Sequence, residues 1–206
     1  HVLRVWPISL DPLLYHLLSH AGMQVFGVGP FAPRFPAFLG FLLMQVCLFF
    51  FVRNMAGGRA GAVAAAFPAL TATLYYSAEG RPYGLMLGLY ALALWCWQVG
   101  ARRDAQRGWA LVGLAVAIAA TINAHYFGIL LLIPICAGEG YRTLARRRVD
   151  WPMWAAIGAG MAGFAGTLPF LKGAGEFKKH YYNAGSVGMH DITRAYRSIF
   201  LDYTRM

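Results

Sequence analysis

Long apolar runs separated by short polar turns occupy the chain from residue 37 to residue 171. An α-helix rises about 1.5 Å per residue, so roughly 20 apolar residues cross the hydrocarbon core of a membrane, with about 17 as the lower limit. Six runs come close to or exceed this length: Ala37–Arg53, Ala60–Ser77, Tyr83–Gly100, Gly108–Asn123, Phe127–Leu144 and Pro152–Leu171. The pattern predicts an all-α integral membrane protein with about six transmembrane helices in a serpentine bundle.

Two segments outside these runs have the pattern of amphipathic helices. Asp11 and Pro12 favour a helix start, because Asp caps helices well and Pro suits the first helical position. The apolar residues that follow share one face, opposite His16, His20 and Gln24, and comprise Leu14, Leu17, Leu18, Ala21 and Val25. We expect an outer-face segment over 1–36 with an interfacial helix, a bundle over 37–171, and an outer-face loop and amphipathic helix over 172–206.

The composition agrees with a membrane protein, since 59% of the residues are hydrophobic and only 13% are charged. A soluble domain carries about 25% charged residues. The net charge of +10 would suit a nucleic-acid-binding protein, but most of the arginines lie in three alternate turns, at 53–59, 102–107 and 142–148. Short arginine-rich turns are cytoplasmic in membrane proteins. The charge therefore predicts topology, and no nucleic-acid partner is expected.

This topology places all six histidines on the outer side, together with five of the eight acidic residues. The most informative outer turn is Tyr75–Tyr83, which contains Glu79 and Arg81. A carboxylate and a guanidinium near lipid are costly unless they are paired or used, and a planar guanidinium suits a phosphate. The alternative is a solvated polar turn whose tyrosines lie in the aromatic belt.

Three further groups are candidates for binding. His125 and Tyr126 lie at the neighbouring outer turn, where a hydrogen-bonded interface residue is the alternative to a substrate contact. Lys178 and Lys179 could bind an anionic headgroup or a substrate phosphate, or lie in a solvated loop. His16 and His20 have a spacing that zinc can use, but no third ligand is indicated. No metal site is therefore predicted, and a divalent metal is left open.

Four sequence elements together resemble the membrane glycosyltransferases of the GT-C superfamily, in particular the protein mannosyltransferase and ArnT-like branch. They are Asp-Pro-Leu-Leu-Tyr-His from Asp11, Arg34 with Pro36, Tyr-Tyr-Ser-Ala-Glu-Gly-Arg-Pro-Tyr from Tyr75, and His-Tyr-Phe-Gly from His125. The resemblance implies many spanning helices, further helices lying on the membrane, and a cavity that faces the periplasm or lumen. It also implies transfer of a sugar from a polyprenyl-phosphate donor to an acceptor lipid, glycan or protein.

The resemblance also assigns roles to residues. It implies that Glu79 and Arg81 line the cavity near the donor sugar and phosphate, with His125 facing them. On that basis Asp11 and Glu79 are the carboxylates available as catalytic residues, and Arg81 is the phosphate contact, assisted by Lys178 or Lys179. Tyr83, His125 and Tyr126 are the expected substrate contacts. The main catalytic carboxylate of such enzymes is expected upstream of His1. The expected location is a bacterial inner membrane with a periplasmic active face, with other membrane subunits as further partners.

Two other classes of function stay open at this stage. The first is a non-catalytic membrane subunit or scaffold that keeps the GT-C-like fold. The second is a transporter, which would place ionisable residues near the middle of its spans. Only Glu139 approaches such a position, and it lies toward the arginine-rich end of its run.

Overall fold

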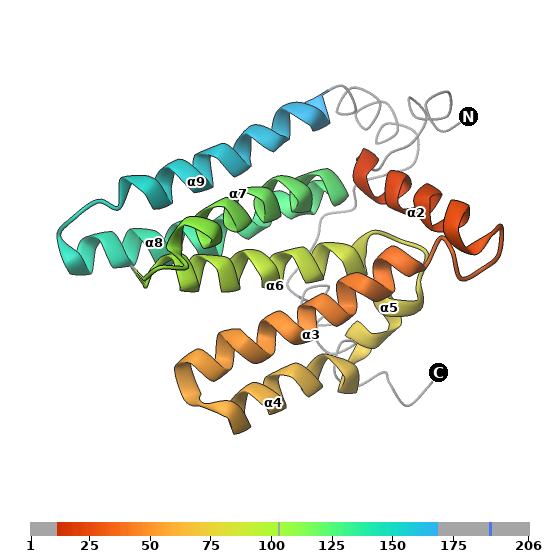
Figure 1. Ribbon diagram of the computed structural model, residues 1–206, viewed down its shortest axis with the longest axis horizontal. Helices are drawn as coiled ribbons and strands as arrows, with labels where there is room; N and C mark the ends of the chain where they lie inside the picture. The colour runs from red at the N-terminus through yellow and green to blue at the C-terminus, as the bar shows by residue number, and fades with distance from the viewer. Residues whose placement is uncertain (1–11, 103, 169–189, 191–206) are drawn as a thin grey trace.

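A computed structural model describes residues 12–102, 104–168 and 190, and none of these residues lies in a β-strand. Figure 1 shows a bundle of helices arranged roughly side by side. The α-helices are α2 (Leu13–Phe26), α3 (Phe35–Ala56), α4 (Gly58–Ala66), α5 (Tyr75–Ala78), α6 (Tyr83–Gly100), α7 (Arg107–Ala124), α8 (Leu132–Arg146) and α9 (Trp151–Met161). The predicted all-α class is confirmed.

Four of the predicted spans form helical stretches that are long and apolar enough to cross a membrane. They are Phe35–Ala56, Tyr83–Gly100, Arg107–Ala124 and Tyr126–Arg146, where the last combines the 3-10 helix η4 (Tyr126–Leu131) with α8. Their limits lie within a few residues of the predicted runs. The chain is therefore an integral membrane protein.

The predicted second span is not one continuous helix. After α4 the backbone passes through the 3-10 helices η2 (Phe67–Leu70) and η3 (Ala72–Leu74) before α5. Pro68 cannot donate a backbone hydrogen bond, and Thr71 is extended, with φ −124° and ψ 171°. The Thr71 hydroxyl donates to the carbonyl of Pro68 over 3.0 Å. The expected helix over Ala60–Ser77 is thus interrupted, although the segment still returns along α3 (Figure 1).

The predicted sixth span is interrupted as well. The α-helix α9 ends at Met161 and continues as the 3-10 helix η5 (Ala162–Thr167). Asn123 of α7 donates through Nδ2 to the carbonyl of Gly163 over 2.9 Å, which ties this segment to the end of α7. Residues 169–171 of the predicted run lie outside the described residues.

Backbone contact between α3 and α6 holds the centre of the bundle together. A Cβ atom added to Gly88 would lie 2.2 Å from the carbonyl oxygen of Gly40, and one added to Gly40 would lie 2.3 Å from the Cα of Leu85. Small residues allow such close approach, which drives helix association in lipid. At the other end of the same pair, Asn54 donates to Gln98 over 2.9 Å. The two helices therefore run parallel.

Helix α2 packs against α3 and α7 through a face other than its apolar one. Its buried residues are Tyr15, Ser19 and Gly22, whereas Leu17 and Val25 of the expected apolar face are exposed. In water this would be unfavourable. At a membrane surface the apolar face contacts lipid instead, so the small and polar residues turn toward the protein.

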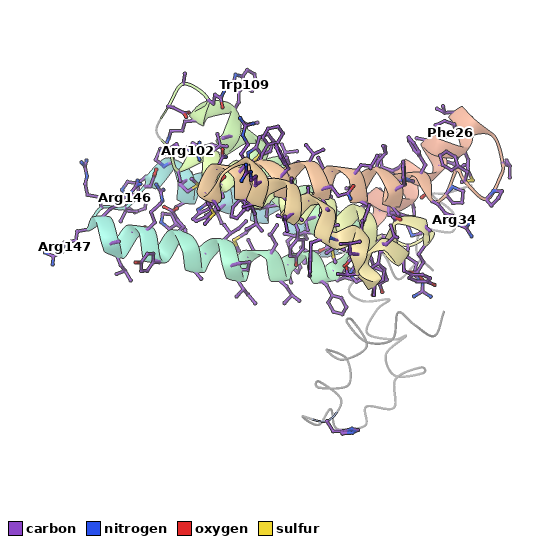
Figure 2. All side chains as sticks on the ribbon, turned by 90° about the horizontal axis from the view of Figure 1, so that it is seen from below. Phe26, Arg34, Arg102, Trp109, Arg146 and Arg147 are labelled. Atoms are coloured by element: carbon purple, nitrogen blue, oxygen red, sulfur yellow. The ribbon has the colours of Figure 1, made fainter. Side chains whose placement is uncertain are left out.

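The three arginine-rich turns meet at one end of the bundle, which we call the arginine-rich end. Arg102 donates to the carbonyl of Asn54, and Arg142 donates to the carbonyl of Ala101. Figure 2 shows Arg102, Arg146 and Arg147 at this end, with Arg34 and Phe26 at the opposite end. The segregation of arginines that the alternating turns predict is confirmed.

A buried network of ion pairs closes the arginine-rich end. Arg142 bonds both oxygens of Glu139, over 2.7 and 2.8 Å, and Asp150 over 2.6 Å. Arg107 pairs with the other oxygen of Asp150, and Trp97 donates to Glu139 over 3.1 Å. Burial alone would raise the pKa of Asp150, but the two guanidinium groups outweigh it and hold that pKa below its usual value. The network joins α6, α7 and α8 to the start of α9.

The glycine contact between α3 and α6 can be tested with two alanine substitutions. Gly88→Ala forces the helix backbones apart, so we expect a loss of about 1 to 3 kcal/mol in the free energy of unfolding. Gly158→Ala is the matched control, because a Cβ added there meets no atom within 4 Å. The measurement is unfolding of the purified protein in detergent. Equal stability of the two variants would contradict the assigned contact.

Candidate functional site

The turn between α5 and α6 lies at the end opposite the arginine-rich end, and we call this the tyrosine end. Ser77 donates its hydroxyl to the carbonyl of Leu74 over 2.7 Å, which ties α5 to the end of η3. Glu79 is then extended, with φ −80° and ψ 134°, and Pro82 leads directly into α6. Proline suits the residue before a helix because its φ is already near the helical value. The turn therefore holds Glu79 and Arg81 at the tip of the bundle.

Glu79 and Arg81 form an ion pair within this turn. The Nε atom of Arg81 lies 3.1 Å from Oε1 of Glu79, and the side chains are 65% and 17% exposed, respectively. The terminal nitrogens of Arg81 form no hydrogen bond with any described residue. Glu79 therefore pairs with the guanidinium through Nε, which leaves the two terminal nitrogens to bind an anion in a bidentate manner.

Aromatic rings join this turn to the one that follows α7. The ring of Tyr83 lies 5.1 Å from the ring of His125 and 5.3 Å from that of Tyr76. The ring of Phe127 lies 5.0 Å from that of His125. The structure thus brings His125 into contact with Tyr83, which follows the turn that holds Glu79 and Arg81.

His125 also has a structural role. Its Nδ1 accepts a hydrogen bond from the backbone N–H of Phe127 over 3.1 Å, so the side chain caps the first turn of η4. An accepting Nδ1 carries no proton, which places the proton of the neutral ring on Nε2. The hydroxyl of Tyr126 is shielded from solvent, so Tyr126 does not present that group at the surface.

Two residues of the site were not assigned a role from the sequence. Tyr15 of α2 is buried, and its hydroxyl donates to the carbonyl of Pro33 over 2.8 Å. The pKa of Tyr15 is raised to about 12, mainly by burial and with a smaller contribution from the negative charge of Glu79, while a hydrogen bond with Ser19 acts in the opposite direction. Tyr15 is therefore protonated at neutral pH and lies within electrostatic range of Glu79.

Arg34 is the second residue without an assigned role. A Cβ atom added to Gly80 would lie 3.9 Å from Cγ of Arg34, so this arginine flanks the turn that holds Glu79 and Arg81. The sequence pointed to Arg34 only as part of the Arg34 and Pro36 element, one of the four that resemble the GT-C glycosyltransferases. The proximity to Gly80 depends on the packing of α3 against α6, which the sequence does not display.

An apolar groove of about 400 Å³ lies beside the turn, between α2, α3 and the first turn of α6. Leu85 lines it and lies four residues after Arg81, and Phe35 and Pro36 line it directly after Arg34. The remaining lining residues are Leu18, Ala21, Gly22, Val25, Phe26 and Leu39. An arginine-flanked turn next to an apolar groove suits a ligand that has a phosphate and a hydrocarbon chain.

Several predicted site residues are not placed by the structure. Asp11, Lys178 and Lys179 lie outside the described residues. In the part of the chain that is described, no group of three His, Cys, Asp or Glu side chains could hold a metal ion. Glu79 is the carboxylate that the described residues supply at the tyrosine end.

Comparison with known proteins gives one match. The family model described as dolichyl-phosphate-mannose-protein mannosyltransferase matches residues 11–171, which is more than half of the 206-residue chain. The matched region contains the turn at 75–83, His125 and the apolar groove. No curated protein and no solved structure matches the chain.

The cap made by His125 predicts a difference between two substitutions. His125→Ala removes the acceptor for the N–H of Phe127, so we expect a loss of about 1 kcal/mol in the free energy of unfolding. His125→Asn supplies an acceptor at nearly the same place and should keep most of that stability. Unfolding in detergent measures both, and an Asn variant as unstable as the Ala variant would rule out the capping role.

Proposed function

The chain belongs to the dolichyl-phosphate-mannose-protein mannosyltransferase family of membrane glycosyltransferases, and we propose that it transfers a sugar from a polyprenyl-phosphate donor at its tyrosine end. The observation that carries the proposal is the Glu79–Arg81 pair beside an apolar groove. A polyprenyl-phosphate sugar has the two features that this arrangement suits, an anionic phosphate and a long hydrocarbon chain.

The reaction exchanges one bond of the sugar for another. An acceptor oxygen bonds to C1 of the sugar, the bond between C1 and the donor phosphate oxygen breaks, and the lipid phosphate leaves with the bonding electrons. The acceptor proton passes to a base. Negative charge therefore grows on the phosphate, and a cation already held in position stabilises it most effectively.

Arg81 is the residue that we assign to the leaving phosphate. Its Nε is held by Glu79 over 3.1 Å, so its orientation is fixed before the donor binds. Arg34 flanks the same turn and supplies a second positive charge. Lys178 and Lys179 are proposed as further cations, although they lie outside the described residues.

Glu79 and Asp11 are the proposed carboxylates for the acceptor. Glu79 uses one oxygen for Arg81, and its second oxygen can accept a hydrogen bond from an acceptor hydroxyl. Tyr83, His125 and Tyr126 are proposed to shape the sugar pocket, because Tyr83 and His125 pack together next to the turn. The acceptor is a lipid, a glycan or a protein.

The apolar groove is proposed to hold the first part of the polyprenyl chain. Leu85 and Pro36 of its wall are close in sequence to Arg81 and Arg34. The hydrocarbon chain of a donor whose phosphate binds Arg81 can therefore enter the groove directly. The exposed Leu17 of α2, which does not line the groove, would contact the surrounding lipid. Burial of an isoprenoid chain there adds binding free energy that does not depend on the sugar.

The direction of the site in the membrane follows from the arginines. Short arginine-rich turns remain on the cytoplasmic side, and those of this chain gather at the end opposite the site. We therefore propose that the tyrosine end faces away from the cytoplasm, which in a bacterial inner membrane is the periplasmic side.

Replacement of Arg81 tests the proposed reaction. We expect Arg81→Ala to lower transfer of labelled sugar from a polyprenyl-phosphate donor by about 100-fold or more, because the leaving phosphate loses its oriented cation. Arg81→Lys keeps the charge without the planar fork and should retain part of the activity. Arg59→Ala, an exposed arginine at the other end, is the control and should be active. Undiminished transfer by Arg81→Ala would remove Arg81 from its role.

Cysteine labelling tests the orientation. In a background where Cys47, Cys96 and Cys136 are replaced by Ala, Gly29→Cys places an exposed thiol at the tyrosine end, and Arg59→Cys places one at the other end. We expect a membrane-impermeant maleimide to label intact bacterial cells only through Gly29→Cys. Arg59→Cys should react after permeabilisation, and the reverse pattern would overturn the proposed orientation.

A further inference from the structure

A second cavity lies at the arginine-rich end, far from the proposed active site. Its volume is about 180 Å³, and its lining residues are Glu139, Arg142, Thr143, Arg146, Arg148 and Asp150. It is formed by the last turns of α8 and the connection to α9. The cavity is lined by charged groups and sits where α8 leaves the span, in contrast to the wholly apolar groove at the tyrosine end.

The charges around this cavity leave an excess of two positive groups. Arg142 and Arg107 are engaged with the carboxylates of Glu139 and Asp150, so these four residues neutralise one another. Neither Arg146 nor Arg148 forms an ion pair or hydrogen bond with a residue in the described part of the chain. Two guanidinium groups on one cavity wall therefore have their donors open to an anion.

A buried hydroxyl group at the same place also lacks a partner. The Oγ1 atom of Thr143 is shielded from solvent and forms no hydrogen bond with any residue that the structure describes. A buried polar group without a partner is unfavourable. Thr143 lines the cavity, so rotation about its Cα–Cβ bond turns this hydroxyl toward an oxygen of a phosphate bound there. Thr143 thus adds a neutral donor to the two arginines.

The surroundings of the cavity are apolar. Leu144 is 78% exposed, and Tyr141 and Trp151 are exposed to a similar degree, so large apolar side chains flank the two arginines. Trp and Tyr concentrate at membrane interfaces, at the level of the lipid headgroups. The two arginines therefore lie at the level of the lipid headgroups, where the acyl chains of a bound lipid would contact these apolar side chains.

We propose that this cavity binds the phosphate headgroup of an anionic membrane phospholipid, through Arg146 and Arg148 with Thr143 as a further donor. The lipid belongs to the leaflet at the arginine-rich end. Basic pockets between spanning helices bind anionic headgroups in this way. The bound lipid would join the last turn of α8 to the connection that leads into α9.

Native mass spectrometry of the full-length protein in detergent tests the site. Phosphatidylglycerol is added as the anionic lipid, phosphatidylcholine as the zwitterionic lipid of equal chain length, and glycerol phosphate as the soluble headgroup. We expect phosphatidylglycerol to bind at least about tenfold more tightly than the other two. Equal binding of both lipids would overturn the proposal, and equal binding of glycerol phosphate would assign the site to soluble phosphates instead.

Two double variants distinguish binding at the cavity from a general effect of positive surface charge on lipid binding. Arg146→Gln with Arg148→Gln should weaken binding of phosphatidylglycerol by roughly tenfold or more. Arg53→Gln with Arg59→Gln removes the same charge from the turn between α3 and α4, which lies at the same end and outside the cavity lining, and should bind like the unmodified protein. An equal loss in both double variants would show that no specific site exists.

A third variant tests the neutral donor. Thr143→Val keeps the shape of the side chain and removes the hydroxyl, and it should weaken binding severalfold while the protein stays folded. Unchanged binding by this variant would exclude Thr143 from the site. Sugar transfer serves as a separate readout, so failure of lipid binding at this cavity leaves the test of Arg81 unaffected.

Discussion

The close contact of α3 with α6 determines where the proposed active site forms. Gly40 and Gly88 allow the two backbones to touch, and the parallel course of the helices places both N-termini at the tyrosine end. Arg34, just before α3, consequently lies beside Gly80, just before α6. In lipid the hydrophobic effect does little to join helices, so this contact depends on small residues and close packing. Larger residues at either glycine would separate the charged groups of the site as well as the helices.

At the opposite end, charge replaces close packing as the joining interaction. Glu139 is fully buried, and a buried carboxylate is tolerated only when paired and hydrogen-bonded. Arg142 and the indole of Trp97 meet that need, and Asp150 extends the network to Arg107. Glu139 is thus an ion-paired residue close to the arginine-rich turns. A transporter would instead place an ionisable residue near the middle of a span.

The sequence predicted the parts of the fold that depend on length and polarity. Apolar run length located four spans, because every backbone group in lipid must be satisfied within a helix. The same rule could not reveal the breaks at Pro68 and Thr71, where side chain and 3-10 bonds replace the α-helical ones. It also could not identify which face of α2 packs on the protein. For the candidate site, the sequence singled out the turn at 75–83 and His125, whereas the place of Tyr15 depends on how α2 packs against α3 and α7.

The bonding of each arginine separates structural from ligand-binding roles better than its position in the chain does. The guanidinium of Arg142 donates to two carboxylates and a carbonyl, so few of its donors remain for a ligand. Arg81 is held through Nε alone, which fixes its orientation and leaves the paired terminal nitrogens for a phosphate. Arg146 lacks even that anchor in the described residues, so a ligand there must order the side chain as it binds. An oriented arginine therefore suits a transient charge in a reaction, and an unanchored one suits a resident lipid.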